Sequence, residues 1–425
     1  MTLLLKNARV VDPSQRLDAV RDVLVQNGRI AKVAERIRED GGEVLDLSGF
    51  HVCPGFIDMH VHLREPGYEW KETIATGTRS AAAGGFTGIA CMPNTVPPID
   101  SRSVVEFVLA QARQHGTVRV YPIGCVSKGQ MGEELAEMGD MAIAGARGFS
   151  DDGKPVASAG LMRRALEYAR IFDLPVIDHC EEPTLVAGGV VHEGAISTRL
   201  GLKGWPGVAE DLMVQRDVLL AQYTGGSVHI AHMSTARSAD IVRRAKREGI
   251  KVTCEVTPHH LVLEEGAVAG YDTNAKMNPP LRTESDRAAL VEALADGTVD
   301  AIATDHAPHH ADEKCVEFSL APFGVVGLET AVSLALDRLV HKGHVPLPRL
   351  VELFTTGPAK VLRLDKGTLA VGVDADVTVL DLERQVTVEP GSFRSKSANT
   401  PFSGWTLRGG PVMTIVSGRI VHDAR

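Results

Sequence analysis

The middle of the chain alternates eight short apolar runs with helical patterns, and this alternation constrains the fold more than any other feature. The apolar runs are typical of buried strands and span residues 53–61, 86–92, 118–125, 146–150, 175–178, 227–231, 252–256 and 299–304. Helical patterns occur between them at residues 101–115, 159–172, 212–223, 238–248 and 284–295. Eight strands separated by helices predict an α/β fold with a closed, parallel (β/α)8 TIM barrel.

An open, doubly wound parallel sheet is the alternative to a barrel. Such a sheet typically carries a glycine-rich phosphate loop directly after its first strand. Here the first strand ends in the sequence DMHVH (residues 58–62), and no Gly-x-Gly-x-x-Gly motif follows it. The sequence therefore favours the barrel and gives no support to dinucleotide binding.

The two ends of the chain differ from the middle, because neither contains a long helical pattern. Short strands joined by turns fill residues 3–47, with one turn at Asn27-Gly28, and the same pattern returns from Gly367 onward. Either end alone would bury too little apolar surface to be stable. We therefore expect residues 1–52 and 366–425 to form one composite β-sandwich domain beside a barrel domain of residues 53–365.

The composition indicates a globular protein and limits its partners. Lysine and arginine total 45 and aspartate and glutamate total 54, so the formal net charge is −9. A negative chain without a basic block argues against nucleic acid or an anionic membrane as the main partner. The first residues contain too short an apolar run for a signal peptide, and no run reaches the length of a membrane span. The six cysteines form no Cys-x-x-Cys pair, so we expect free thiols and a cytoplasmic location.

Polar side chains mark the carboxyl ends of most of the predicted barrel strands. They are His60 and His62, Asn94, Asp151 with Asp152, His179, His232 and Asp305. In a barrel these strand ends meet at one mouth, where such folds bind their ligands. A single histidine at a strand end is commonly structural, but four histidines with aspartates at the ends of five strands indicate a metal site.

The residue types and their spacing favour zinc. His60 and His62 are two residues apart on a strand, so both side chains can point to the same ion. Imidazole and carboxylate ligands suit zinc, and no set of cysteines competes with them. Six ligands exceed the three that one catalytic zinc usually takes, so we predict two ions bridged by an aspartate of the fourth strand, Asp151 or Asp152.

A pair of zinc ions implies hydrolysis. Two metals about 3.5–4 Å apart can share a hydroxide whose pKa falls towards 7, and this hydroxide is the expected nucleophile. Asp305 has the position and charge to accept its proton and return it to a leaving nitrogen. We therefore expect hydrolysis of an amide or ester, and the sequence contains no Gly-x-Ser-x-Gly elbow that would indicate a serine hydrolase.

The order of these residues within a barrel, flanked by a split β domain, resembles the amidohydrolase superfamily. Within that superfamily, the motifs resemble those of bacterial type I dihydroorotases. They are PGFIDMHVHLREPG (54–67), MPNT (92–95), GFSDDGKPV (148–156), DHCEE (178–182), HMST (232–235), MNPPLR (277–282) and ATDHAPH (303–309). Because the flanking β domain also fits, the resemblance covers nearly the whole chain.

The resemblance implies that the chain interconverts dihydroorotate, a cyclic ureide with a carboxylate, and N-carbamoyl-L-aspartate in the third step of pyrimidine synthesis. It implies one zinc ion held by His60, His62, Asp152 and Asp305, and a second held by Asp152, His179 and His232. It favours Asp152 over Asp151 as the bridge, where hydantoinases, allantoinases and some dihydroorotases carry a carboxylated lysine. The substrate contacts that it implies are His62, Arg64, Asn94, Asn278, His309 and the backbone of Phe323 and Gly324.

Several of these residues have simpler interpretations. Arg64 could form a surface ion pair with Glu65 instead of binding the substrate carboxylate with its planar guanidinium. Asn94 and Asn278 stand beside prolines and could only shape turns. Cys180 follows His179 directly, so it points to the opposite face and is expected to be a packed thiol. For His259 and His260, which end the seventh strand, a structural role is the alternative to lining the mouth.

Two other functions compete with this interpretation. Allantoinases and dihydropyrimidinases are related cyclic amidases, but their substrates lack the ring carboxylate that Arg64 would bind. The resemblance also allows a subunit that is structural, or active only in complex with aspartate transcarbamoylase. Retention of all six ligand positions argues against a purely structural role. A homodimer is common in the family, and we expect residues 311–321 to form a loop that gates the mouth.

Overall fold

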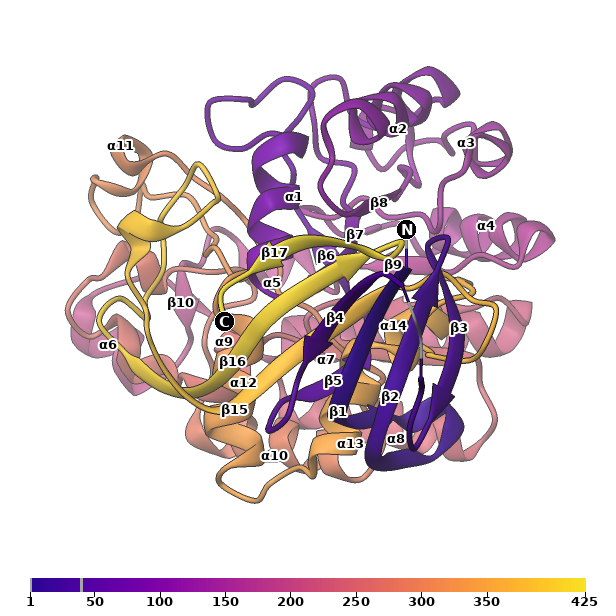
Figure 1. Cartoon of the computed structure of the whole chain (residues 1–425). Helices are drawn as coiled ribbons and strands as arrows, with labels where there is room; N and C mark the ends of the chain where they lie inside the picture. The colour runs from indigo at the N-terminus through magenta and orange to yellow at the C-terminus, as the bar shows by residue number, and fades with distance from the viewer. Residues whose placement is uncertain (1, 39–40) are drawn as a thin grey trace.

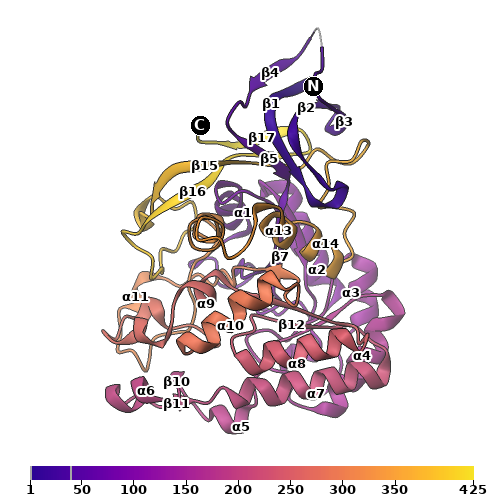
Figure 2. The same cartoon turned by 90° about the horizontal axis from the view of Figure 1, so that it is seen from below.

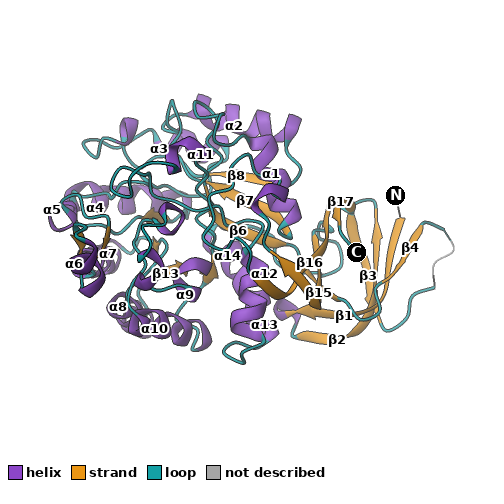
Figure 3. Ribbon diagram, turned by 90° about the vertical axis from the view of Figure 1, so that its left-hand side faces the viewer, coloured by secondary structure: helices purple, strands orange, loops and turns teal. Residues whose placement is uncertain are grey.

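The computed structural model describes residues 2–38 and 41–425. Residues 1 and 39–40, which fall in the predicted N-terminal β segment, lie outside the described residues. The described chain has an α/β region and a sheet built from both chain ends, the latter at the right in Figure 3. Within the described residues, no helix has the length and apolar character needed to cross a membrane.

The two ends of the chain share one sheet (Figure 1). Its strands are β1 (Thr2–Asp12), β2 (Leu17–Gln26), β3 (Arg29–Ala34), β4 (Glu43–Asp46), β5 (His51–Pro54), β15 (Val377–Thr387), β16 (Thr406–Val416) and β17 (Arg419–Asp423). Their order is β17-β16-β15-β5-β1-β2-β3, with β4 paired to β1. The antiparallel pair β5–β15, in which Val52 lies opposite Val379, joins the two ends. Leu5, Val377 and Met413 share one buried cluster, so each end covers the apolar surface of the other.

The middle of the chain forms two parallel sheets. One consists of β6 (Phe56–Val61), β7 (Phe86–Cys91) and β8 (Arg119–Pro122), and the other of β9 (Val176–Asp178), β12 (Val228–Ile230), β13 (Val252–Val256) and β14 (Ala301–Ile302). Parallel bridges link the sheets at both edges: Phe149 bridges Gly124 and Val176 on one side, and Val61 bridges His306 on the other. The carboxyl ends of these strands therefore lie at a common edge.

The fourth predicted strand differs from the expectation. Residues 146–150 contribute only the bridges of Phe149 rather than a continuous strand. The backbone N–H of Phe149 donates to the carbonyl oxygen of Pro175 (3.1 Å). The N–H of Ile177 donates back to the carbonyl oxygen of Phe149 (2.7 Å), but Pro175 has no N–H that could extend the ladder towards residue 147. The segment still delivers the residues that follow Phe149 to the edge where the strands end.

The helices of the described chain include long ones that cover the outer side of the parallel strands (Figure 2) and short ones that lie in the connecting loops. They are α1 (Ile74–Ala83), α2 (Arg102–His115), α3 (Met138–Ala144), α4 (Ala159–Ala169), α5 (Pro183–Val186), α6 (Ala195–Leu200), α7 (Val208–Thr224), α8 (Ala236–Arg247), α9 (Pro258–Val262), α10 (Glu284–Ala295), α11 (Ala311–Lys314), α12 (Ala331–Ala335), α13 (Leu347–Phe354) and α14 (Thr356–Val361). A separate short pair consists of β10 (Val191–His192) and β11 (Gly204–Trp205). In α8, the Thr235 side chain caps the first turn, and Ile241, Val242 and Ala245 are buried. One apolar face and a capped start explain this helix.

Candidate active site

Four histidines and two aspartates converge where the parallel strands end. His60 and His62 lie at the end of β6, Asp152 follows the bridge at Phe149, His179 follows β9, His232 follows β12 and Asp305 follows β14. All six side chains are buried. The structure therefore brings together six residues that are up to 245 positions apart in sequence, the difference between Asp305 and His60.

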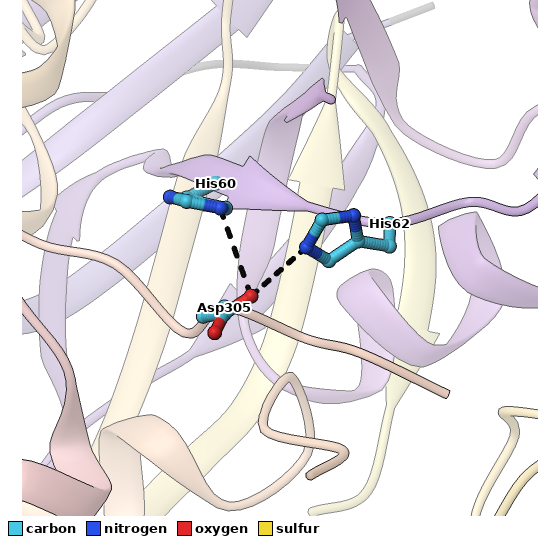
Figure 4. A group of neighbouring side chains, drawn as sticks. All are labelled: His60, His62 and Asp305. Atoms are coloured by element: carbon cyan, nitrogen blue, oxygen red, sulfur yellow. Dashed lines mark hydrogen bonds and ion pairs between the residues drawn. The ribbon is translucent and has the colours of Figure 1, made fainter. Parts of the chain in front are cut away.

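One half of the cluster contains His60, His62 and Asp305, which Figure 4 shows. The Oδ1 atom of Asp305 lies 2.9 Å from Nε2 of His62 and 3.6 Å from Nε2 of His60. The same two nitrogens approach Asp152, with Nε2 of His60 at 3.3 Å from Oδ1 and Nε2 of His62 at 3.4 Å from Oδ2. Two carboxylates and two imidazoles thus face one small volume.

The other half of the cluster contains His179 and His232. The Nδ1 atom of His179 and the Nε2 atom of His232 lie 3.6 Å and 3.5 Å from Oδ1 of Asp152. These two ring nitrogens are only 2.9 Å apart. Asp152 therefore stands between the two pairs of histidines and contacts both.

The outer nitrogens of the histidines are fixed by oxygen acceptors. Nδ1 of His60 faces Oε1 of Glu255 (2.6 Å), and Nδ1 of His62 faces Oδ1 of Asn94 (2.8 Å). In the neutral form that binds a metal, each imidazole carries one N–H, which these acceptors hold at Nδ1 in both rings. The Nε2 atoms consequently present lone pairs to the cluster, as metal ligands require.

His179 is oriented in the same way with the opposite nitrogen. Its Nε2 atom donates to Oε2 of Glu181 (3.0 Å), which leaves Nδ1 for the cluster. Asn278 also donates to Oε2 of Glu181, through Nδ2 at 3.1 Å, while its buried Oδ1 has no hydrogen-bond partner among the described residues. Asn94 thus contacts His62, and Asn278 contacts the glutamate that orients His179, so both asparagines do more than shape turns.

The chemistry of the cluster fits metal ions. Nε2 of His60 and Oδ1 of Asp152 are buried and lack a hydrogen-bond partner within the described chain. Such orphaned polar atoms cost about 1–3 kcal/mol each, a cost that ligation of a cation removes. Burial opposes ionisation, but the neighbouring histidine rings, His60 foremost for Asp152 and His62 for Asp305, hold the pKa of both carboxyl groups below the usual range. Both side chains are therefore carboxylates, the form that binds metals.

Glu255, which the sequence analysis did not single out, supports the cluster from β13. Its Oε1 accepts from His60 and its Oε2 faces Nε2 of His229 at 3.3 Å. Burial works against its ionisation, yet His60 and His229 lower the pKa of Glu255 to about 2. A glutamate within the apolar run VTCEV was the available signal, because a charge inside a buried strand requires a partner.

Glu255→Gln is expected to weaken metal binding about tenfold or more, because the anion that orients His60 and raises its basicity becomes a neutral amide. Titration of the metal-free protein with zinc against a competing chelator measures this change. The exposed Glu248 provides a matched control, Glu248→Gln, which is expected to bind zinc as the parent chain does. Equal zinc affinities for Glu255→Gln and the control would contradict the role assigned to Glu255.

A cavity of about 310 Å³ opens onto the cluster. Its lining includes all seven residues for which the sequence analysis expected a substrate contact, namely His62, Arg64, Asn94, Asn278, His309, Phe323 and Gly324. It also includes Asp152, His179, His232 and Asp305. The lining contains five of the six cluster residues; the sixth, His60, is fully buried and does not reach the cavity.

Arg64 lines this cavity as a buried cation: burial lowers its pKa, and the charges of Asp305 and Asp152 partly oppose this shift without forming an ion pair. Its side chain forms no ion pair within the described residues, and its one assigned hydrogen bond runs from Nε to the carbonyl oxygen of Pro308 (3.3 Å). Glu65 is not its partner, because Oε2 of Glu65 accepts from the N–H of Ile74 (2.8 Å). A buried guanidinium is costly unless an anion neutralises it, so the cavity is suited to a ligand that carries a carboxylate.

His309 lies beside Arg64 with both ring nitrogens engaged. Nε2 donates to the carbonyl oxygen of Phe323 (2.8 Å), and Nδ1 accepts from Nζ of Lys71 (3.3 Å). Burial together with the charges of Arg64 and Lys71 lowers the pKa of His309 to about 2. His309 is therefore neutral, and the positive charge in this part of the site comes from Arg64 and Lys71.

Residues 311–321 form the expected loop near the mouth and include α11. Two buried lysines fasten this loop: Lys314 donates to the carbonyl oxygen of Pro322 (2.8 Å), and Lys276 donates to those of Phe318 (2.7 Å) and Ala321 (2.6 Å). Neither lysine was identified from the sequence, because their carbonyl partners carry no residue-type signal. A gating role for the loop stays a prediction.

Three other polar residues from the sequence analysis lie outside the cluster. Sγ of Cys180 is buried and lies 3.5 Å from Oδ2 of Asp217. Oδ1 of Asp151 accepts the backbone N–H groups of residues 126 and 127, each at 3.0 Å. Nε2 of His260 donates to the carbonyl oxygen of Pro279 (3.0 Å). Asp151 and His260 thus bind backbone of other segments and Cys180 contacts a carboxylate outside the cluster.

The parallel strands and the buried histidine–aspartate cluster at their ends define a metal-dependent amidohydrolase. Two family models match the chain, one described as "Dihydro-orotase-like" over residues 49–238 and one as "Amidohydrolase family" over residues 221–422. A dihydroorotase from Geobacter sp. (strain M21) is 54% identical over 425 residues, which are 100% of both chains. A dihydroorotase from Pelotomaculum thermopropionicum is 56% identical over 426 residues, covering 100% of this chain and 99% of that protein. The chain belongs to the dihydroorotase family.

Solved structures show the same architecture. An L-hydantoinase (dihydropyrimidinase) from Arthrobacter aurescens superposes with a TM-score of 0.91 and 28% identity, covering 99% of this chain and 96% of that one. A dihydropyrimidinase from Brevibacillus agri has a TM-score of 0.88 and 23% identity, covering 100% and 95%. At the latter identity the likeness concerns the fold alone.

Proposed function

We propose that the chain is a dihydroorotase, which reversibly hydrolyses the cyclic amide of (S)-dihydroorotate to N-carbamoyl-L-aspartate, the third step of de novo pyrimidine synthesis. The observation that carries this proposal is Arg64, a buried guanidinium that forms no ion pair with any described residue and lines the cavity that opens onto the cluster. A ring carboxylate at this place would neutralise it, and allantoin and dihydrouracil lack that group. The full-length relatives named dihydroorotase support the same conclusion.

The proposed cofactor is a pair of zinc ions. One would be held by His60, His62, Asp152 and Asp305, and the other by Asp152, His179 and His232. The shared contacts of Asp152 with both pairs of histidines support its role as the bridge. When bound, such a metal pair supplies Lewis acidity, which makes water a stronger nucleophile and polarises a carbonyl group.

The side chains of the cavity have distinct roles in the proposed reaction. Arg64 binds the ring carboxylate with its planar fork and so orients the ring. Asn278 has an Oδ1 without a hydrogen-bond partner among the described residues, and this oxygen accepts a ring N–H. Asp305 accepts a proton from the attacking water and returns it to the ring nitrogen as the C–N bond breaks. In ring closure the same carboxylate carries the proton in the opposite direction.

The finer description of the fold is also a proposal. Residues 53–365 would form a closed (β/α)8 barrel, which the parallel bridges at both edges of the two sheets support. Residues 1–52 and 366–425 would form the composite β-sandwich domain, which the shared cluster of both chain ends supports. The described cysteines are free thiols, which accords with the reducing cytoplasm as the proposed location.

The deciding experiment is turnover of L-dihydroorotate by the purified chain, with metal content measured on the same sample. Turnover with two zinc ions per chain is the expected result. Aspartate transcarbamoylase is added in a parallel assay, since the isolated chain would be inactive if it required this partner. Absence of dihydroorotate turnover in both assays, or faster turnover of allantoin or dihydrouracil, would overturn the proposal.

A further inference from the structure

A residue from the terminal sheet region reaches the wall of the substrate cavity. Asn399 lies in the connection between β15 and β16, which passes beside α11 in Figure 1. Its side chain is only 5% exposed. Oδ1 accepts the backbone N–H of His309 (3.0 Å), and Nδ2 donates to the carbonyl oxygens of Ala307 (3.1 Å) and Gly324 (3.0 Å). One amide group thus joins two segments that line the cavity.

The two joined segments approach each other closely. The N–H of Ala307 donates to the carbonyl oxygen of Val325 (2.8 Å), and the carbonyl oxygen of Asn399 accepts from the N–H of Val326 (2.9 Å). Gly324 has a φ of 132°, and a Cβ atom there would lie 2.7 Å from Cβ of Ala307. The separation of the two segments is therefore set within narrow limits, and the Asn399 side chain spans it.

We propose that Asn399 is a positioning residue that fixes the substrate-contact wall formed by His309 and Gly324. The inference rests on the proposed function, because these two residues are substrate contacts only if that function holds. The three hydrogen bonds to the wall need one acceptor and two donor hydrogens on a small planar group, and the asparagine amide supplies both. Aspartate retains the acceptor for the N–H of His309 but cannot donate to the carbonyl oxygens of Ala307 and Gly324, so Asn399→Asp separates the accepted hydrogen bond from the donated ones.

The segment around Asn399 is anchored independently of this side chain. Oγ of Ser397 donates to the carbonyl oxygen of Lys71 (2.8 Å), and Nζ of Lys396 donates to that of Glu69 (2.6 Å). Removing the Asn399 side chain therefore leaves the connection in place. The expected damage is confined to the wall that carries His309 and Gly324.

The first test compares the steady-state kinetics of Asn399→Ala and Asn399→Asp. Both variants are expected to raise KM for dihydroorotate about tenfold, because buried backbone groups lose their partners and the wall moves. In both, kcat and metal content are expected to stay close to those of the parent. Thr400→Val is the matched control, since Thr400 is also buried and the one hydrogen bond of its Oγ1 within the described chain is accepted from the nearby N–H of Phe402 (3.3 Å).

The second test does not require substrate. Hydrogen exchange of the peptide 307–310 is expected to be faster in Asn399→Ala, which leaves the His309 N–H unpaired, and nearly unchanged in Asn399→Asp, which keeps its acceptor. An unchanged KM together with unchanged exchange would overturn the inference, and so would loss of metal in Asn399→Ala. If the parent chain does not turn over dihydroorotate, the proposed function fails, while the exchange measurement still decides whether Asn399 fixes the wall.

Discussion

Asp305→Asn is expected to lower kcat for dihydroorotate by about 10³–10⁴-fold, because an amide of the same shape cannot accept the proton that general acid–base catalysis requires. Steady-state assays at saturating zinc measure this loss without the added effect of incomplete metal loading. The substitution also removes one of two carboxylates near His62, so metal is expected to be lost first from the His60 and His62 half of the cluster.

The control for this prediction is Asp312→Asn, which neutralises a carboxylate near the mouth. The Asp312 side chain is 91% exposed, and its one ion pair among the described residues is with the ring of His310, so the activity of this variant is expected to match that of the parent. An Asp305→Asn enzyme within tenfold of the parent at full metal occupancy would contradict proton transfer by Asp305. The reaction would then need a different acceptor for the proton of water.

Asp305 occupies its place through backbone geometry that local sequence does not predict. Its φ is 46°, and the site residues Arg64 and His232 have φ values of 63° and 30°. Residues other than glycine rarely adopt this left-handed region; aspartate and histidine do so more often than arginine, and each does so where surrounding structure compels it. Here the N–H of His62 donates to the carbonyl oxygen of His306 (2.8 Å), which ties the end of β6 to the turn that carries Asp305.

Much of the architecture follows from periodicity. The helix expected at residues 284–295 has the same bounds as α10, and the strand expected at 252–256 has the same bounds as β13. Convergence of the polar residues follows from one geometric fact, since the carboxyl ends of parallel strands lie on the same edge. This geometry predicts one site for His60 and Asp305, although β6 and β14 are the first and last of the parallel strands along the sequence.

The residues that support the site were not predicted from the sequence, because their hydrogen-bond partners are far away along the chain and are often backbone atoms. Glu255 sits inside an apolar run and becomes intelligible only when His60 and His229 are placed beside it. Asn399 stands in a segment of turn-forming residues, where asparagine is ordinary. Its carbonyl and N–H partners at 307–309 and 324 belong to a remote part of the chain. Long-range hydrogen bonds to backbone leave no pattern in the sequence.

Arg64→Met is expected to reduce kcat/KM for dihydroorotate by about 10³-fold, because loss of a buried, hydrogen-bonded charge partner typically costs 2–5 kcal/mol. Methionine keeps the length of the side chain and its packing while removing the charge. Arg64→Lys is expected to fall between the parent and Arg64→Met, since lysine retains the charge but lacks the planar fork for two oxygens. Arg102→Met, at an exposed ion pair with Glu106, serves as the control.

A pair of ligands separates carboxylate recognition from general damage to the site. Orotate and uracil share a planar ring and differ by the carboxylate, so the ratio of their inhibition constants reports the contact to Arg64 alone. The parent is expected to prefer orotate strongly, and Arg64→Met is expected to lose that preference while its weak affinity for uracil changes little. Equal losses of affinity for orotate and uracil would mean that Arg64 supports the shape of the cavity and does not bind a carboxylate. That result would contradict the observation on which a carboxylate-bearing substrate is proposed.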